Sequence, residues 1–338
     1  MPQLLLHRTM RAAPGLAACG AIALVSLVIG RAAPAVGSAA PAIALGVGCA
    51  VLRAPGPALH PGMAWASGPG LRVAIVLLGA GLPIQSVVAA GAEALPVMAA
   101  TLGACALATV VVGRVLGVGR RLRTLVGAGT GICGASAIAA IAPVIGASSA
   151  EIAYAMSTIF LFNLLAVVVF PVLGHALGLD AHAFGVLAGT AVNDTSSVIA
   201  AAGVFGGGAL AVAVAVKLVR TLAIIPLSIA LSIGESRRGG GGSPLTPSRA
   251  AALVPWFLIG FALLALARSA GWIPAGMQDV ISQASGFLIA AALAGVGLST
   301  DIRAVLRAGW RPLGLGAILS AVVAGTALAV MSAFGALA

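Results

Sequence analysis

Long, uninterrupted apolar runs constrain the fold of this chain more than any other feature. Of its 338 residues, 61% are hydrophobic and 7% are charged, and the mean hydropathy is +1.17. Soluble domains carry roughly a quarter charged residues, so a soluble enzyme, a nucleic-acid-binding domain and a disordered chain are excluded. The runs also lack the apolar–polar alternation of a membrane barrel. We therefore predict an all-α polytopic membrane protein.

The apolar runs predict about 11 transmembrane helices, because ~20 apolar residues span a bilayer. The N-terminal stretch resembles a signal peptide, but further spans follow it directly and favour an uncleaved first helix. Residues 1–338 are expected to form a single transmembrane domain, whose halves 1–234 and 249–338 are joined by a Gly-rich cytoplasmic linker, 235–248. The predicted spans lie at residues 12–30, 38–52, 71–90, 94–113, 122–145, 150–173, 183–203, 208–233, 250–268, 280–299 and 311–335.

Basic residues indicate the orientation. Most of the 18 Lys and Arg residues fall on one side of the predicted spans if the N-terminus is placed in the cytoplasm. The positive-inside rule therefore predicts a multi-pass membrane protein with a cytoplasmic N-terminus and an external C-terminus. The formal charge of +11 is then explained by the basic residues that gather on the cytoplasmic side. Because aromatic residues for base stacking are few, no nucleic-acid partner is expected.

Two weak internal similarities occur in the chain, and the first favours inverted repeats, which are common in secondary transporters. Residues 79–82 recur at 295–298, in predicted spans of opposite orientation, and each is followed by a small-residue turn, at 90–91 and 308–309. Residues 129–144 also match residues 189–204. Chance similarity in a chain rich in Gly and Ala is the alternative.

The predicted span 122–145 is dense in glycine. Such density weakens a helix, and a break in a membrane helix is tolerated where it lines a cavity or is buried in protein. A broken helix exposes N–H groups that attract anions. The alternative is that the glycines only allow close helix packing. We predict a break at residues 131–134, with Thr130, Cys133, Gly134 and Ser136 as substrate-binding candidates.

A polar run interrupts the predicted span 183–203. Such residues are costly in hydrocarbon, so they are expected to face a cavity or one another. A water-exposed loop between two half-spans is the alternative. Asp194 is the only acid well inside a predicted span, and we expect it to carry a proton. The substrate-binding candidates in this run are Asn193, Asp194, Thr195, Ser196 and Ser197.

Lys217 and Arg220 share one helix face in the predicted span 208–233. Each costs ~2.5–3.5 kcal/mol at mid-membrane. Because Asp194 can neutralise only one of them, an anionic substrate would complete the charge balance. The alternative is a buried ion pair between Asp194 and either cation that only holds helices together. Weaker polar candidates, which would line the same cavity or bond across helices, are Asn163, Gln283 and Ser285.

The four cysteines lie in apolar stretches without metal-ligand spacing, so they are expected to be buried thiols. No nucleophile–base pair or HExxH motif is present. We therefore expect no cofactor, no metal site and no enzyme activity.

Several segments resemble motifs of the sulfate exporter family of bacterial membrane proteins, over about residues 15–335. Many members of that family carry His at the place of Asn193 and Gln at that of Ser197. The family is similar to the sodium/proton antiporter and bile-acid symporter superfamily, which implies crossing discontinuous helices and a panel that moves against a core. The segments that carry the resemblance are 72–79, 131–140, 189–198, 217–220 and 309–313.

The residues and the resemblance together predict a secondary transporter in the lipid bilayer of the bacterial inner (plasma) membrane. Its substrate would be a small inorganic or organic anion, sulfate or sulfonate-like, moved by alternating access. Export is one direction that this prediction allows. A proton or sodium ion is the expected coupling ion, and a homodimer is left open. The alternatives are an anion channel on the same scaffold and, with less support, an intramembrane enzyme.

Overall fold

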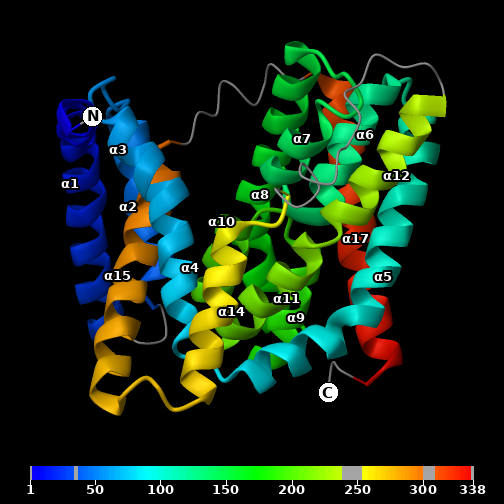
Figure 1. Cartoon of the computed structure of the whole chain (residues 1–338). Helices are drawn as coiled ribbons and strands as arrows, with labels where there is room; N and C mark the ends of the chain where they lie inside the picture. The colour runs from blue at the N-terminus through cyan, green and yellow to red at the C-terminus, as the bar shows by residue number, and fades with distance from the viewer. Residues whose placement is uncertain (1, 34–36, 238–252, 300–308, 336–338) are drawn as a thin grey trace. The chain divides into compact units, whose positions relative to one another are not determined.

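The computed structural model describes residues 2–33, 37–237, 253–299 and 309–335, and these residues fold into helices joined by turns and short connections (Figure 1). Within these described residues, seven helices or helix runs are long and apolar enough to cross a membrane, and four apolar helices are shorter. The chain is therefore an all-α polytopic membrane protein. The long segments are Ala12–Ala32, His60–Gly79, Ile84–Val115, Ser149–Ala176, Ala209–Arg237, Gly276–Leu298 and Trp310–Ala333.

The chain clusters into two compact units. The first contains residues 1–87, 202–206 and 256–301, and the second contains residues 88–201, 207–255 and 302–338. Both units draw on residues from either side of the predicted 235–248 linker. Residues 235–237 of that linker belong to a helix, whereas residues 238–248 lie outside the described residues. The division into halves at the linker stays a prediction.

The first unit is built around α15. This helix packs against α1, α2, α4 and the π-helical turn η1. Ser285 donates a hydrogen bond of 2.9 Å to the carbonyl of Ala74, so it bonds across helices, one of its two predicted roles. Cys49 is exposed, which corrects its expected burial. The helices are α1 (Pro2–Ala32), α2 (Ala39–Leu52), α3 (His60–Trp65), η1 (Ala66–Gly70), α4 (Leu71–Gly79), α14 (Trp256–Ser269) and α15 (Ala275–Leu298).

The predicted spans 71–90 and 94–113 have wrong boundaries. Helix α4 ends at Gly79, and α5 (Ile84–Val115) runs through the turn predicted at residues 90–91. The segment between them contains glycine and Pro83, which cannot continue a helix. Gly91 instead allows close packing within the second unit, because a Cβ at this position would lie 2.9 Å from Val219.

The second unit contains one helix hairpin and most of another, whose last residues, 202–205, cluster with the first unit. Its other helices are most of α5, from residue 88 onward, together with α8 (Ser149–Ala176), α11 (Ala209–Thr221), α12 (Ile224–Arg237) and α17 (Trp310–Ala333). Helices α11 and α12 follow each other in the apolar segment Ala209–Arg237. We call this segment the Ala209–Arg237 axis, and its two ends define the two ends of the unit.

The first hairpin consists of α6 (Arg120–Ala128), the π-helical turn η2 (Gly129–Cys133) and α7 (Ala135–Ile141). Helix α7 folds back along the hairpin, since a Cβ on Gly129 would lie 3.2 Å from Cδ1 of Ile138. Helices α6 and α7 pack against each other, and α7 also packs against α12 (Figure 1). Residues 122–145 therefore turn back within the unit, which corrects their prediction as a span.

The second hairpin consists of α9 (Ala181–Ala191) and α10 (Thr195–Phe205). After α10 the chain returns to the start of α9, because a Cβ on Gly207 would lie 3.2 Å from the Cβ of Ala181. This return corrects the prediction of residues 183–203 as a span. Apolarity alone misled the prediction, because a hairpin buried among helices is as apolar as a spanning helix.

The hairpins enter from opposite ends of the Ala209–Arg237 axis. The first begins at Arg120, which pairs with Glu235 near the end of α12. The second begins at Ala181, close to Gly207 and the start of α11. The tips of both hairpins meet α11 in the interior of this axis. The matching segments 129–144 and 189–204 thus lie in two hairpins that enter from opposite ends.

Candidate anion-binding site at the hairpin tips

The tip of the first hairpin is broken where the sequence predicted. Residues 129–133 form a π-helical turn, and the N–H of Gly134 donates 2.9 Å to the carbonyl of Gly129, five residues back. Gly134 itself has φ of 67° and ψ of −128°, a backbone conformation open almost only to glycine. The predicted loss of regular bonding at 131–134 is confirmed, and the break leaves helical carbonyls without partners along the chain.

Lys217 connects the two hairpin tips. Its side chain is fully buried, and its Nζ donates hydrogen bonds to the carbonyls of Ile132, at 2.6 Å, and Val192, at 2.9 Å. Ile132 lies at the end of η2, and Val192 is the C-cap of α9. The ammonium group therefore lies at the C-terminal ends of two short helices, where a positive charge is favourable.

Arg220 lies one turn further along α11 and makes the same kind of contact. Its guanidinium donates from Nη2 to the carbonyl of Thr130, at 3.2 Å, and from Nη1 to that of Val192, at 3.4 Å. Only 1% of this residue is exposed. Helix α9 can approach α11 closely because Gly185 and Gly189 face it; a Cβ at either would lie within 3 Å of α11 side chains.

Neither cation forms an ion pair with Asp194 among the described residues. The structure instead gives both cations the backbone carbonyls of the helix ends as partners, which residue identities do not indicate. The carboxylate of Asp194 instead caps α10, where it accepts hydrogen bonds from the Ser196 hydroxyl and, at 3.0 Å, from the Ser196 N–H. The alternative of a buried Asp194–cation pair is therefore wrong.

Asp194 nevertheless belongs to the same site. Its Cβ would lie 3.1 Å from a Cβ built on Gly134, so the two hairpins touch at these residues. The backbone N–H of Asp194 donates 3.2 Å to Oδ1 of Asn163 on α8. Asn163 thus supports the second tip, and its predicted place near the site is confirmed.

Three buried polar atoms at the site lack a hydrogen-bond partner: Nε of Arg220, Oδ1 of Asn193 and Oγ1 of Thr130. All three residues are at most 3% exposed. An unpartnered buried polar atom costs about 1–3 kcal/mol, so three of them in adjoining residues mark a place where a ligand or water would bind.

The remaining predicted residues differ in position. Cys133 is buried at the first tip, and Ser197 is buried in the first turns of α10, whereas Thr195 is half-buried. Ser136 is exposed on α7, so its predicted role in binding has no support from burial. Gln283 lies in the first unit and is exposed. Among the described residues, no group of three or more His, Cys, Asp and Glu residues could hold a metal ion.

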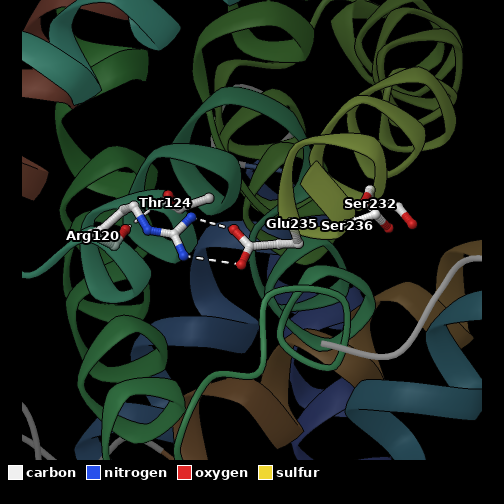
Figure 2. Close-up of polar contacts among 5 residues, drawn as sticks. All are labelled: Arg120, Thr124, Ser232, Glu235 and Ser236. Carbon is white, nitrogen blue, oxygen red and sulfur yellow. Dashed lines mark hydrogen bonds and ion pairs between the residues drawn. The ribbon is translucent and has the colours of Figure 1, made fainter. Parts of the chain in front are cut away.

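The base of the first hairpin carries an ion pair that the sequence analysis did not predict. Figure 2 shows the guanidinium of Arg120 facing the carboxylate of Glu235, with the Nη2–Oε2 bond at 3.0 Å. Glu235 is only 4% exposed. The hydrogen bond to Glu235 raises the pKa of Arg120 above its ordinary value. Such a pair cannot be found from sequence spacing, because its members come from distant helices.

Comparisons with known proteins agree over nearly the whole chain. A family model described as conserved hypothetical protein 698 matches residues 14–316. A UPF0324 membrane protein of Streptococcus agalactiae is 36% identical over 309 residues, which cover 90% of this chain and 92% of the relative. Another from Streptococcus pneumoniae is 37% identical over 329 residues, covering 95% and 97%. No solved structure matches the chain.

Proposed function

This chain belongs to the UPF0324 membrane protein family, and we propose that it is a secondary transporter of a small anion that works by alternating access. Its relatives are named only as membrane proteins, so the proposal depends on the site. Sulfate and sulfonate-like substrates, export, coupling to a proton or sodium ion and the absence of enzyme activity remain predictions from the sequence.

The observation that carries the proposal is the buried positive charge at the hairpin tips. Lys217 and Arg220 supply two charges, and each helix C-terminus they contact supplies about −0.5. Asp194 supplies one negative charge, about half of which the N-terminus of α10 offsets. The remaining charge is about +0.5, and the Nε of Arg220 still has a proton to donate. An anion fits both conditions.

The hairpins also suit alternating access. Each enters the second unit from a different end of the Ala209–Arg237 axis, and both reach the same two cations. Movement of one hairpin would open the site toward one end only, because the other hairpin continues to cover it. A site reached from either end in turn is the property that distinguishes a transporter from an open channel.

Charge within the second unit supports the predicted orientation. Its described arginines near the base of the first hairpin are Arg114, Arg120, Arg121, Arg123, Arg237 and Arg311, whereas Glu93, Asp180 and His182 lie toward the base of the second. The positive-inside rule would place the first hairpin's base in the cytoplasm.

Counterflow in proteoliposomes tests the proposal. Vesicles loaded with sulfate, hydrogencarbonate, nitrate or methanesulfonate should transiently accumulate the same radiolabelled anion from outside, and uptake should saturate. Lys217→Gln and Arg220→Gln, if folded by size-exclusion chromatography, should lose at least about tenfold in rate. Arg121→Gln, an exposed arginine at the base of the first hairpin, is the matched control and should transport normally.

Two results would contradict the proposal. Uptake that rises linearly with concentration and shows no counterflow would indicate a channel. An absence of any anion-dependent uptake from a folded, correctly inserted protein would refute anion transport altogether.

A further inference from the structure

The hydrogen-bonding pattern of the site points to a specific kind of anion. Within the proposed function, we propose that the substrate is a singly charged oxyanion that retains one O–H group, such as hydrogencarbonate or hydrogensulfite. This class excludes sulfate, which carries two charges, and nitrate, which has no proton to donate. The inference depends on charge and on the three unpartnered atoms at the hairpin tips.

The charge balance favours a single negative charge. With the helix ends and Asp194 included, the site carries about +0.5 charge. One negative charge leaves the site near −0.5, whereas a dianion leaves it near −1.5. Because Lys217 and Arg220 are fully buried, water screens little of this excess. A monoanion therefore leaves less uncompensated charge in the site than a dianion does, and the charge balance favours it.

Thr130 is set apart from the other buried threonines by its free hydroxyl. Thr190, which occupies the matching position in the second hairpin, donates 2.7 Å to the carbonyl of Val186 within its own helix. Thr101 and Thr109 bond to carbonyls four residues back in the same way. The π-helical turn disrupts this pattern at Thr130, whose Oγ1 has no partner. The hydroxyl is therefore available to a ligand.

A ligand that both accepts and donates would satisfy the three free atoms together. Arg220 Nε can only donate, and Asn193 Oδ1 can only accept, while the Thr130 hydroxyl can do either. These residues adjoin, because the guanidinium of Arg220 contacts the backbone of Thr130 and of Val192, which precedes Asn193. A deprotonated oxygen would accept from Arg220, and an O–H group would donate to Asn193.

Equilibrium binding to the full-length protein in detergent tests the inference. Isothermal titration calorimetry would compare hydrogencarbonate, nitrate and sulfate at one pH and constant ionic strength. Nitrate is the sharpest comparison, because it shares the charge and planar shape of hydrogencarbonate and differs by the missing proton. We expect hydrogencarbonate to bind at least about tenfold more tightly than either.

Matched variants locate the effect. Asn193→Leu removes the acceptor and should reduce hydrogencarbonate affinity by about tenfold, with nitrate affinity unchanged or higher. Thr130→Val should weaken hydrogencarbonate binding, whereas Thr190→Val, the same change at the matching position, should not. Thermal unfolding of each variant confirms that it is folded.

The outcomes separate this inference from the proposed function. Nitrate or sulfate binding as tightly as hydrogencarbonate would overturn the O–H requirement and leave anion transport intact. Equal effects of Thr130→Val and Thr190→Val on hydrogencarbonate binding would also overturn it. A wild-type protein that binds none of the three anions and shows no counterflow would overturn both proposals.

Discussion

Replacement of Gly134 by alanine tests the geometry of the hairpin tips. This residue has φ of 67° and ψ of −128°, and a Cβ would lie 3.1 Å from the Cβ of Asp194. The backbone conformation costs a non-glycine residue about 1–3 kcal/mol. Overpacking against the second tip adds about 1–3 kcal/mol. Gly134→Ala should therefore destabilise the protein by about 2–6 kcal/mol.

Two other glycines separate the cost of the backbone conformation from the cost of overpacking. Gly178 also has a positive φ, of 66°, but a Cβ there meets nothing within 4 Å, so Gly178→Ala should cost only about 1–2 kcal/mol. Gly103 lies in α5 with a normal φ and open space, and Gly103→Ala should be neutral or stabilising. Thermal unfolding in detergent should rank the three variants in this order. A melting temperature for Gly134→Ala equal to that of Gly178→Ala would refute the contact between the tips.

Three further predictions follow from other parts of the second unit. Arg120→Gln should lower stability by about 1–3 kcal/mol, because it removes a charged hydrogen-bond donor from the buried carboxylate of Glu235, while Arg121→Gln should cost nearly nothing in the same unfolding assay. Ser148→Ala should cost about 1 kcal/mol by removing the capping box of α8, with Ser149→Ala as the neutral comparison. In a cysteine-free background, Gly119→Cys and residues of the 239–242 linker should react with an impermeant thiol reagent from the cytoplasm, and Leu177→Cys and Ala338→Cys only from outside; labelling of Gly119→Cys and Leu177→Cys from one side would contradict the opposed hairpins.

The sequence predicted which residues meet at the hairpin tips better than it predicted the course of the chain around them. Membrane class follows from apolar runs, and the break at Gly134 follows from glycine density, because both depend on local composition. The polar run after Val192 and the two cations on α11 were also placed together correctly. Each of these features is costly in a membrane and therefore rare, so it can be recognised in a single sequence.

The hairpins and the cation partners could not be predicted in the same way. Whether a chain continues or turns back at Gly134 depends on packing against α8 and α12, which involves residues distant in sequence. Every residue has a backbone carbonyl, so residue identity could not indicate which carbonyls Lys217 contacts. Arg120 is the first residue of the first hairpin, and Glu235 lies in α12, after the second hairpin, so no local sequence pattern indicates that they pair.

Anion binding by the two cation variants tests the central claim most directly. Lys217→Gln and Arg220→Gln, each shown to be folded, would be compared with the wild-type protein by equilibrium titration with hydrogencarbonate and, separately, with sulfate and nitrate. The account predicts that each variant loses at least about tenfold in affinity for the anion that binds the wild type best. If both variants are folded and bind that anion with wild-type affinity, the two cations only hold the helix ends together, and the hairpin tips are not the binding site.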